Sequence, residues 1–360
     1  MYVNKEEQQI INIFQELLNK YDKQGTREVR DGHTRVSLFG KQCRFDLSKS
    51  FPLLTHRQHF ARAAFEEVMW YLRGQTDNQI LKDKNVHVWD LWEGQIDPKN
   101  PTELGKIYGH MFRKFGEVDE YKPYFNYNGD YIPERSSHTF VKGFDQIAWL
   151  LNEIKVNPNS SRLILSNWDP KVSTKTPKEA VLPCCLTLLQ FHVEELSESE
   201  RKRWLDANYE GGGLKAIVDY CDTGVDVEDE YRKEEIQEHG FGNLLNHYSV
   251  PKAKLSSQLY QRSSDCTVAG GWNITQMCLL THLIAQQSDL AVGDFVWTTG
   301  DIHFYGDQVE DVRVMASRSI YPFPQIKINK AKDIFSYEWS DIEVIGYQHS
   351  GKIENLKVSL

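Results

Sequence analysis

A buried strand preceded by two adjacent cysteines is predicted from residues 181–193, which read VLPCCLTLLQFHV. The apolar and β-branched run over residues 186–193 is typical of a strand inside a sheet. Pro183 ends any structure that enters from the N-terminal side, so Cys184 and Cys185 lie where the strand begins. A thiol held rigidly at the end of a strand is well positioned for a nucleophile. Taken alone, the stretch favours the alternative that both cysteines are small buried hydrophobic residues.

The composition argues against several classes of protein. The 360 residues can form one large domain or two average ones, and 40% hydrophobic residues are ordinary for a globular protein. The net charge of -9 argues against a general nucleic-acid-binding protein. It does not exclude a small anionic substrate, because a few convergent arginines can hold a phosphate in an acidic chain.

Six cysteines in a chain of 360 residues do not indicate a disulfide framework. The chain has no CxxC pair and no HExxH motif, so the local spacing does not predict a metal site either. The N-terminus carries Lys5, Glu6 and Glu7 and has no apolar signal core. The uncharged stretch 266–288 contains too many polar residues for a membrane span and predicts a buried helix. We therefore expect a cytosolic protein that binds neither DNA nor a membrane.

Hydrophobic periodicity predicts a chain of mixed helices and strands. Helices are expected over residues 6–23, 56–73, 144–156 and 273–288. Two further helices are expected after the loops that begin at residues 105 and 301. Strands are expected over residues 36–40, 43–47, 162–168, 186–193, 255–262, 294–299, 326–328 and 342–345, with a hairpin around Gly40. Glu66 and Glu67 lie in the middle of the second helix, so one of them must point towards its apolar face.

Two segments are interpreted as insertions into this framework. Residues 117–141 are polar and rich in tyrosine. Residues 194–254 contain fifteen Asp and Glu against eight Lys and Arg, which gives -7 of the chain's net charge of -9. Without this second segment the strands on either side of it would be joined by a tight turn, so we interpret it as an excursion from a β-hairpin. The acidity therefore says little about the active site.

Three polar clusters interrupt apolar surroundings. They comprise residues 261–265 at the end of an expected strand, 270–273 at the start of a helix, and 300–305 after another strand. Each cluster alone predicts a turn. Together with a thiol at a strand end, they predict one pocket that contains a nucleophile, a guanidinium group, amide and hydroxyl groups, and aromatic walls.

With these clusters in view, the sequence resembles the folate-dependent thymidylate synthase family. The resemblance extends from Arg30 to the C-terminus, outside the two insertions. It is carried by ordered blocks, namely Phe51 to Thr55, Glu67 with Trp70, Trp89-Asp90, Leu104-Gly105 with Tyr108-Gly109, Pro183 with Cys185, Gln258 to Asp265, Asn273-Ile274 and Gly300 to Tyr305. It implies a single α+β domain over residues 1–360, with insertions at about 117–141 and 194–254. The implied three-layer fold has helices flanking a twisted mixed β-sheet, through which two copies form a homodimer.

The resemblance also implies an activity, the reductive methylation of dUMP to dTMP with 5,10-methylenetetrahydrofolate as co-substrate and dihydrofolate as second product. Cys185 corresponds to the nucleophile that adds to C6 of the pyrimidine, and Arg262 nearby favours its thiolate. Glu67 corresponds to the carboxylate that organises water for proton transfers, joined by Tyr108. Asn273 corresponds to the amide that hydrogen-bonds the O4 and N3 edge of uracil, where it can both donate and accept.

The other implied site residues divide between the two ligands, and no metal is implied. Nucleotide contacts are implied for Arg30, Arg162, Gln261, Arg262, Ser263, Asp265, Asn273, His303 and Tyr305, with Arg162 reaching across from a partner subunit. Folate contacts are implied for Trp89, Trp92, Asp265, Trp272 and Tyr347. Without the resemblance, most of these side chains would be interpreted as core, capping or surface residues.

The chain departs from the family pattern beside the expected base site. Leu186 stands where a histidine usually follows the nucleophile, and Ser161 stands where the first of two paired arginines is usual. Gly270-Gly271-Trp272 replaces a bulkier apolar pair and a phenylalanine. Leu186 and the glycine pair leave room for a different arrangement of water around the base.

These departures leave alternatives open. The same scaffold supports a dUMP (or dCMP) 5-hydroxymethylase, in which water instead of hydride attacks the methylene intermediate. Asn273 favours uracil, because the cytosine-specific relatives that resemble this family carry aspartate there. A third hypothesis is an idle relative that binds a nucleotide or a partner through its acidic insertion. The nucleophile could also lie one residue earlier, at Cys184.

Overall fold

The computed structural model describes residues 4–30, 32–128, 132–174, 179–208, 241–353 and 356, without the side chains of Arg30, Glu120, Tyr121 and Glu134. Within these ranges, no helix has the length and apolar character needed to cross a membrane.

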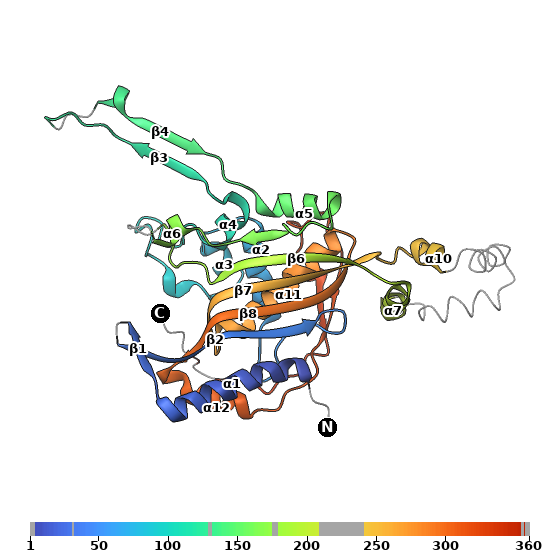
Figure 1. Cartoon of the computed structure of the whole chain (residues 1–360). Coiled ribbons are helices and arrows are strands. Elements are labelled where there is room, and N and C mark those ends of the chain that lie inside the picture. Colours follow the sequence, from blue (N-terminus) through green and yellow to red (C-terminus); the bar gives the residue numbers. More distant parts are fainter. Residues whose placement is uncertain are drawn as a thin grey trace, which may run out of the picture.

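A six-stranded mixed β-sheet forms the centre of the molecule (Figure 1). Its strands, in spatial order, are β1 (Arg27–Arg30), β2 (His33–Asp46), β8 (Ala291–Tyr305), β7 (Ala253–Asp265), β6 (Leu186–Glu195) and β5 (Ile164–Ser166). Neighbouring strands are antiparallel except β7 and β8, which run parallel. Helix α11 (Ala269–Gln287) connects this parallel pair, because a parallel connection needs a crossover. The mixed α+β content and the mixed sheet agree with the prediction from sequence.

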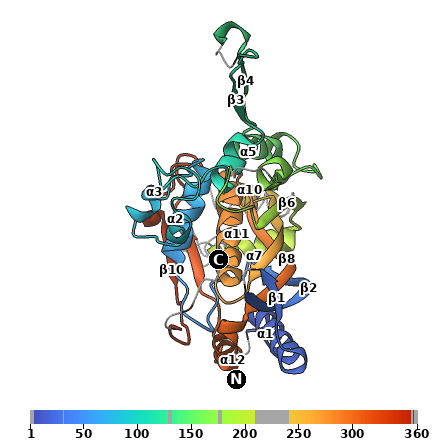
Figure 2. The same ribbon diagram turned by 90° about the vertical axis from the view of Figure 1, so that its left-hand side faces the viewer.

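Helices cover one face of the sheet. Helix α1 (Lys5–Gln24) packs on β2, and α11 packs on β7 and β8. Helix α2 (Ala61–Leu72) packs on α11, and Figure 2 shows both of these helices on one side of the strands. The side chains that face this layer, such as Phe14, Leu259 and Ile274, are almost fully buried and form the core.

The opposite face of the sheet is not covered in the same way. Along β7, Gln258 and Tyr260 are exposed while their sequence neighbours Leu259 and Gln261 are buried. Phe39 on β2 is 83% exposed. Strands in which alternate residues are exposed present a second surface that another molecule can cover.

The remaining elements lie around the sheet. They are α3 (Gln79–Lys82), α4 (Tyr108–Lys114), α5 (Gln146–Val156), α6 (Pro170–Thr174), α12 (Val309–Ser317) and a two-stranded sheet of β9 (Gln325–Ile328) and β10 (Ile342–Ile345). Both late strands, and the helices expected from 105, 144 and 301 onwards, are confirmed within a few residues.

The predicted hairpin around Gly40 is wrong. Strand β2 continues through Gly40, whose φ of +74° is tolerated inside the strand because glycine has no Cβ. Pairing with β8 extends on both sides of this residue, from Phe39 to Asp301 and from Lys41 to Thr299. The hairpin lies earlier in the chain, between β1 and β2.

The polar residues predicted to form turns after β7 and β8 lie inside these strands. Strand β7 runs to Asp265 and not to Arg262, and β8 runs to Tyr305 and not to Thr299. The two strands remain paired in parallel as far as Asp265 and His303. The ladder satisfies the backbone hydrogen-bonding groups, so polar side chains do not end either strand.

Helix α2 begins at Ala61, five residues later than predicted, and α11 begins at Ala269, four residues earlier. The segment before α2 is tied to α1. The carboxylate of Glu7 accepts hydrogen bonds from the backbone N–H groups of Thr55 and His56, at 2.6 and 2.8 Å.

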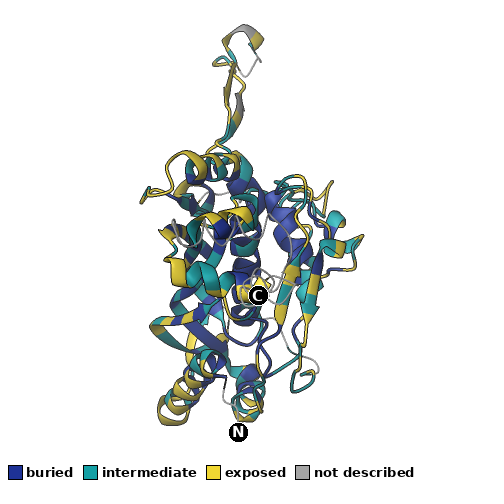
Figure 3. Cartoon of the chain, turned by 90° about the vertical axis from the view of Figure 1, so that its right-hand side faces the viewer, coloured by how far each residue is buried: buried dark blue, intermediate teal, exposed yellow. Residues whose placement is uncertain are grey.

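The segment predicted as the first insertion forms a hairpin of β3 (Val118–Lys122) and β4 (Ser137–Val141) that projects from the body of the molecule. Figure 3 shows that this hairpin is largely exposed. The strands beside the second segment pair directly, with Val193 opposite Leu255, which confirms that the excursion leaves a β-hairpin.

The described ends of the second segment are α7 (Glu198–Asn208) and α10 (Gly242–His247), which share a small cluster around Leu205 and Leu245. They lie at the opposite end of β6 from Cys185 (Figure 1). Residues 209–240, including the glycine triplet, lie outside the described residues. The division of the chain into one domain with insertions stays a prediction.

Candidate active site

A cavity of about 400 Å³ lies between the start of β6 and the C-terminal ends of β7 and β8. Most of the residues singled out in the sequence line it, namely Glu67, Trp89, Trp92, Tyr108, Cys185, Gln261, Ser263, Asp265, Trp272, Asn273, His303 and Tyr305. They come from segments far apart in the sequence. The strand extensions described above bring the polar clusters 261–265 and 300–305 to the same wall.

The two adjacent cysteines face different surroundings. Cys185 lines the cavity, whereas Cys184 is 3% exposed and belongs to the hydrophobic core. Arg262 donates from Nη2 to Cys185 Sγ across 3.4 Å and to the carbonyl of Pro183 across 2.7 Å. Burial raises the pKa of the Cys185 thiol, and the charge of Arg262 opposes that rise. For Cys184, burial raises the pKa much further.

The hydroxyl of Tyr108 lies against the backbone of the nucleophile segment. Its oxygen accepts hydrogen bonds from the N–H groups of Cys185 and Leu186, at 2.9 and 3.3 Å. Burial raises the pKa of Tyr108 well above its ordinary value, so the phenol keeps its proton at neutral pH. With both acceptor positions used, the O–H of Tyr108 is available to donate elsewhere.

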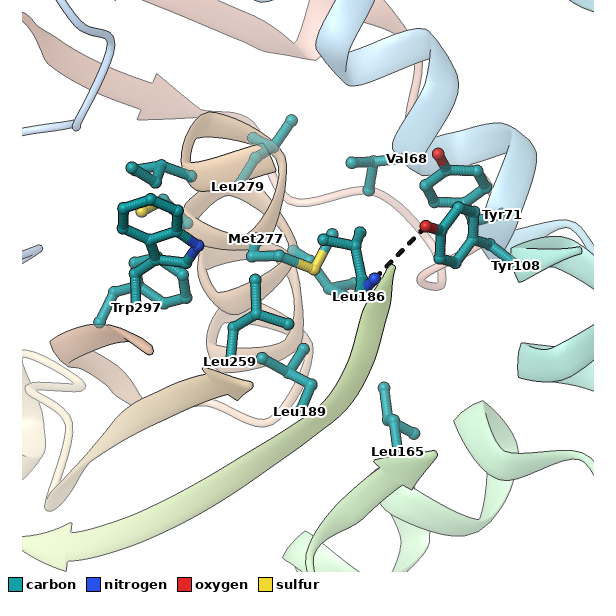
Figure 4. Packing of buried hydrophobic residues seen from close by; sticks show 14 of the residues in the cluster. Val68, Tyr71, Tyr108, Leu165, Leu186, Leu189, Leu259, Met277, Leu279 and Trp297 are labelled. Carbon is teal, nitrogen blue, oxygen red and sulfur yellow. Dashed lines mark hydrogen bonds between the residues drawn. The ribbon is translucent and has the colours of Figure 1, made fainter. Parts of the chain in front are cut away.

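Leu186 does not open space beside the base, contrary to the expectation from sequence. Its side chain is 2% exposed and lies among core residues, with Met277 beside it in Figure 4. It does not contribute to the lining of the cavity described above.

Both glutamates in the middle of α2 are buried, and Glu67 is the one on the cavity side. Glu66 pairs with Lys84 across 2.6 Å. Glu67 accepts hydrogen bonds from four side chains, namely Tyr71, Trp89, Trp272 and Gln276. Burial raises the pKa of Glu67, and these four hydrogen bonds act in the opposite direction.

The polar side chains that line the cavity are fixed in orientation by hydrogen bonds to residues outside the lining. Gln261 accepts from Trp297 Nε1 at 2.9 Å, which fixes the orientation of its amide. Nδ1 of His303 lies 3.0 Å from Asp301, which in turn forms an ion pair with Arg35 at 2.8 Å. These contacts restrict the side chains that face the cavity before any ligand binds.

The aromatic wall is similarly constrained. The rings of Trp89 and Trp92 lie 5.4 Å apart. Asp265 accepts from the backbone N–H of Thr267 at 2.8 Å and from Gln308 Nε2 at 3.0 Å. The lining of the cavity therefore combines aromatic side chains with hydrogen-bonding groups, as sites for small organic ligands usually do.

Three residues named from sequence do not line this cavity, namely Arg262, which donates to Cys185 as described above, Arg162 and Tyr347. Arg162 is exposed and lies just before β5. Tyr347 lines a neighbouring cavity, where its hydroxyl donates to the carbonyl of Leu54 and accepts from the N–H of His59. The side chain of Arg30 lies outside the described residues.

Of the glycine pair, Gly271 does not leave the space expected from sequence, whereas a Cβ on Gly270 would make only ordinary contacts, the nearest 3.4 Å from Ser264 Oγ. A Cβ on Gly271 would lie 2.5 Å from Cε1 of His59 and 2.8 Å from Cδ1 of Leu54. His59 is 5% exposed, and burial lowers its pKa well below the ordinary value. This imidazole therefore occupies the volume that a side chain at position 271 would need.

Sequence reasoning missed several residues of the site, including Arg57, His59, Tyr71 and Leu356 in the lining and Gln276 behind it. Gln276 had a usable signal, because it follows Trp272 by four residues and shares its face of α11. Tyr71 had the same signal, because it follows Glu67 by four residues on α2. The others follow no such pattern. Within the described ranges, no group of three or more His, Cys, Asp or Glu side chains is arranged to hold a metal ion.

Comparison with known proteins identifies the family. The family model described as thymidylate synthase matches residues 8–209 and 243–359, and the unmatched gap falls inside the acidic segment. Proteins named bifunctional dihydrofolate reductase-thymidylate synthase are 30% identical over 361 residues in Paramecium tetraurelia and 30% identical over 362 residues in Zea mays. A putative protein of that name from Oryza sativa subsp. japonica is 31% identical.

These alignments include 98% of this chain but only 62%, 58% and 55% of the Paramecium, Oryza and Zea proteins, so the chain spans somewhat more than half the length of the curated relatives it matches. The family model alone extends over far more than half of the chain. The chain belongs to the thymidylate synthase family.

Proposed function

We propose that the chain catalyses the reductive methylation of dUMP to dTMP with 5,10-methylenetetrahydrofolate, releasing dihydrofolate. The observation that carries this proposal is the position of Cys185. Its thiol lies in a cavity lined both by hydrogen-bonding groups and by the indoles of Trp89, Trp92 and Trp272. The hydrogen-bonding groups suit a pyrimidine nucleotide, and the indoles suit a folate ring.

The first chemical step assigned to the protein is addition of the Cys185 thiolate to C6 of the pyrimidine. The guanidinium of Arg262, 3.4 Å from Sγ, favours the thiolate. Negative charge then develops at O4 of the base, where the amide of Asn273 would stabilise it by donating a hydrogen bond. Tyr108 offers a hydroxyl proton to the same side of the cavity.

The remaining nucleotide groups have matching partners. Ser263 and Arg262, with Arg30 and the partner's Arg162, are proposed to bind the phosphate, because guanidinium groups bind its oxygens in a bidentate manner. His303 and Tyr305 are proposed to bind the sugar hydroxyl, with Gln261 beside them. Asp265 and the three indoles are proposed to hold the folate, and Tyr347 to act in the C-terminal region that closes over it.

The two candidate reactions divide after one-carbon transfer, when the base carries Cys185 at C6 and a methylene group at C5. If hydride from tetrahydrofolate adds to the methylene carbon, C5=C6 re-forms, the thiolate leaves, and dTMP and dihydrofolate result. If water adds instead and loses a proton, the thiolate leaves in the same way. The products are then hydroxymethyl-dUMP and tetrahydrofolate. The features that favoured a hydroxymethylase were Leu186 and the glycine pair. Leu186 is packed in the core, and His59 and Leu54 occupy the space beside Gly271, while a Cβ on Gly270 would make only ordinary contacts.

Product identification tests the proposal. The protein is incubated with dUMP and methylenetetrahydrofolate, and in parallel with dCMP. We expect dTMP by mass spectrometry, together with the absorbance of dihydrofolate, from dUMP only. Hydroxymethyl-dUMP with tetrahydrofolate would reject methylation. A fluorinated dUMP with the folate should add its mass to the peptide that contains Cys185, and absence of any adduct would reject covalent catalysis altogether.

We propose further that two copies form a homodimer through the open face of the sheet. The exposed side chains of Phe39 and Tyr260 favour this surface. If Arg162 completes the phosphate site of the other subunit, Cys185→Ser and Arg162→Ala proteins should both be inactive alone. After the subunits are mixed, some dimers would contain one intact site and activity should return. A lack of recovery with demonstrated mixed dimers would contradict the shared site.

A further inference from the structure

His303, which lines the cavity, is bound to a carboxylate that lies outside the lining. Its Nδ1 lies 3.0 Å from Oδ1 of Asp301, two residues earlier on β8. Only 4% of the His303 side chain is exposed, and its other ring nitrogen, Nε2, forms no hydrogen bond within the described part of the chain. Nε2 is therefore the ring nitrogen that remains for a ligand in the cavity.

Asp301 determines which ring nitrogen carries the proton. Burial raises the pKa of Asp301, but the hydrogen bond from His303 and the charges of Arg35 and Arg27 outweigh burial. The pKa is lowered overall, so the carboxylate is ionised at neutral pH and only accepts hydrogen bonds. In the neutral imidazole the single proton therefore lies on Nδ1, and Nε2 is an acceptor.

Arg35, on β2, holds Asp301 in this position. Its Nη2 donates to Oδ2 of Asp301 across 2.8 Å, which leaves Oδ1 for His303. The side chains of Arg35 and Asp301 are only 21% and 25% exposed, so water screens their attraction less than that of a surface pair. Both residues line a separate cavity of about 370 Å³, together with Lys20 and Arg27. The contact between Asp301 and His303 thus joins that cavity to the candidate active site.

A second ion pair between the same two strands provides a comparison. Arg44 of β2 pairs with Asp294 of β8, and their side chains are 61% and 37% exposed. Asp294 lies near the start of β8, at the opposite end of the strand from His303. Neither member of this pair lines the candidate active site. Exposed pairs contribute little, whereas the pair of Arg35 and Asp301 contacts a residue of the site.

A ring nitrogen that only accepts discriminates between substituents on a sugar. The 3′-hydroxyl of dUMP can donate to Nε2 of His303, because a hydroxyl both donates and accepts. A fluorine in the same place cannot donate, so it would face the lone pair of Nε2 without a hydrogen bond. Sites built to hydrogen-bond a ligand reject analogues that lack the matching group, because a buried polar atom is then left unpaired.

We propose that Arg35 and Asp301 are positioning residues that hold His303 with its proton on Nδ1, so that the site selects a nucleotide whose sugar donates a hydrogen bond to Nε2. This inference rests on the proposed function and assigns the origin of its selectivity for the sugar. His303 is the residue that contacts the sugar, and the pair acts through the orientation and the proton position of this one ring.

Three variants and a control test the pair. In Asp301→Asn, Arg35 binds the amide oxygen and turns the N–H₂ group towards Nδ1, which moves the ring proton of His303 to Nε2. Arg35→Met removes the charge, and Arg35→Lys restores it, since only Nη2 makes the contact. The control, Arg44→Met, removes the exposed pair between the same strands. For each protein, calorimetry without folate measures the dissociation constants of dUMP and of 2′,3′-dideoxy-3′-fluorouridine 5′-monophosphate.

We expect the wild-type protein to bind dUMP at least about tenfold more tightly than the fluoro analogue. This preference should fall about tenfold in Asp301→Asn and about threefold in Arg35→Met, and it should stay unchanged in Arg35→Lys and Arg44→Met. An equal loss of affinity for both ligands in Asp301→Asn and Arg35→Met would overturn the inference and leave the pair a structural role only. If Asp301→Asn does not fold, Arg35→Met compared with Arg35→Lys decides the matter.

A second measurement needs no ligand. In protein labelled with ¹⁵N-histidine, NMR distinguishes a ring that is protonated on Nδ1 from one that is protonated on Nε2. We expect the Nδ1–H form of His303 in the wild type and in Arg44→Met, and the Nε2–H form in Asp301→Asn. A wild-type ring with its proton on Nε2 would overturn the inference. Failure of the proposed function would look different, because the wild type would keep the Nδ1–H form and the preference for dUMP but form no dTMP with the folate.

Discussion

Glu7 and Glu67 are both buried and both saturated with hydrogen bonds, but their donors differ in kind. Glu7 accepts from the backbone and side chains of Thr55 and His56, and so ties α1 to the segment before α2. Glu67 accepts only from side chains, and three of its four donors line the cavity. A carboxylate bound by the backbone fixes the course of the chain, whereas one bound by cavity side chains fixes the shape of the site.

The two cysteines show the same contrast between fold and site, and substitution of Cys185 should have the largest effect of all. Cys185→Ser should lower kcat by about four orders of magnitude or more, since loss of a nucleophile has that scale in other enzymes. Cys184→Ser should leave kcat nearly unchanged and cost about 1–2 kcal/mol of stability, because it buries a hydroxyl in the core. Turnover assays and urea unfolding measure both. The opposite pattern would move the nucleophile to Cys184.

Glu67→Gln tests the carboxylate that belongs to the site. The amide turns an N–H₂ group towards at least one of the four donors, which displaces an indole or the Tyr71 hydroxyl. We expect kcat to fall about a hundredfold, within the range for a group that supports proton transfer. Steady-state kinetics with both substrates measure the change. A variant that loses stability but keeps kcat would make Glu67 equivalent to Glu7 and remove the contrast.

Glu7→Gln is the matched change in the fold. It leaves buried N–H donors of Thr55 or His56 facing an amide, which should cost about 3 kcal/mol of unfolding free energy. Activity per folded molecule should remain within about twofold, because Glu7 itself does not line the cavity. Denaturant titration followed by kinetics on the folded fraction separates the two effects. A hundredfold loss of kcat here would show that the segment after Thr55 couples Glu7 to the cavity.

The smallest expected effect concerns the pH dependence of stability that Glu67 contributes. Burial raises the pKa of Glu67 above 4.5, so the folded protein holds a proton that the unfolded chain releases. This contribution is fully present below about pH 4.5 and is lost as the pH rises through the folded pKa. The free energy of unfolding of wild type minus that of Glu67→Gln should therefore fall as the pH rises from about 4.5 through the folded pKa. A difference that stays constant or grows would contradict the raised pKa.

Periodicity alone located most of the framework of this protein. Alternating apolar residues are enough to identify a strand at 186–193, and helical spacing is enough to identify α1 and α11 within a few residues of their ends. The ordered blocks were specific enough to name the family, because each combines unusual residues at a fixed position in the chain. The excursion after Val193 also followed from local evidence, since the charge of the segment differs sharply from that of the strands beside it.

Tertiary contacts decided the rest. Parallel pairing of β7 with β8 carries both strands through polar residues that look like turns, and Glu7 ties the segment before α2 to α1. The difference between Cys184 and Cys185 also required the fold. Adjacent residues on an extended chain point to opposite sides, and only the packing of α11 on the sheet and of α2 on α11 determines which side is core and which is cavity.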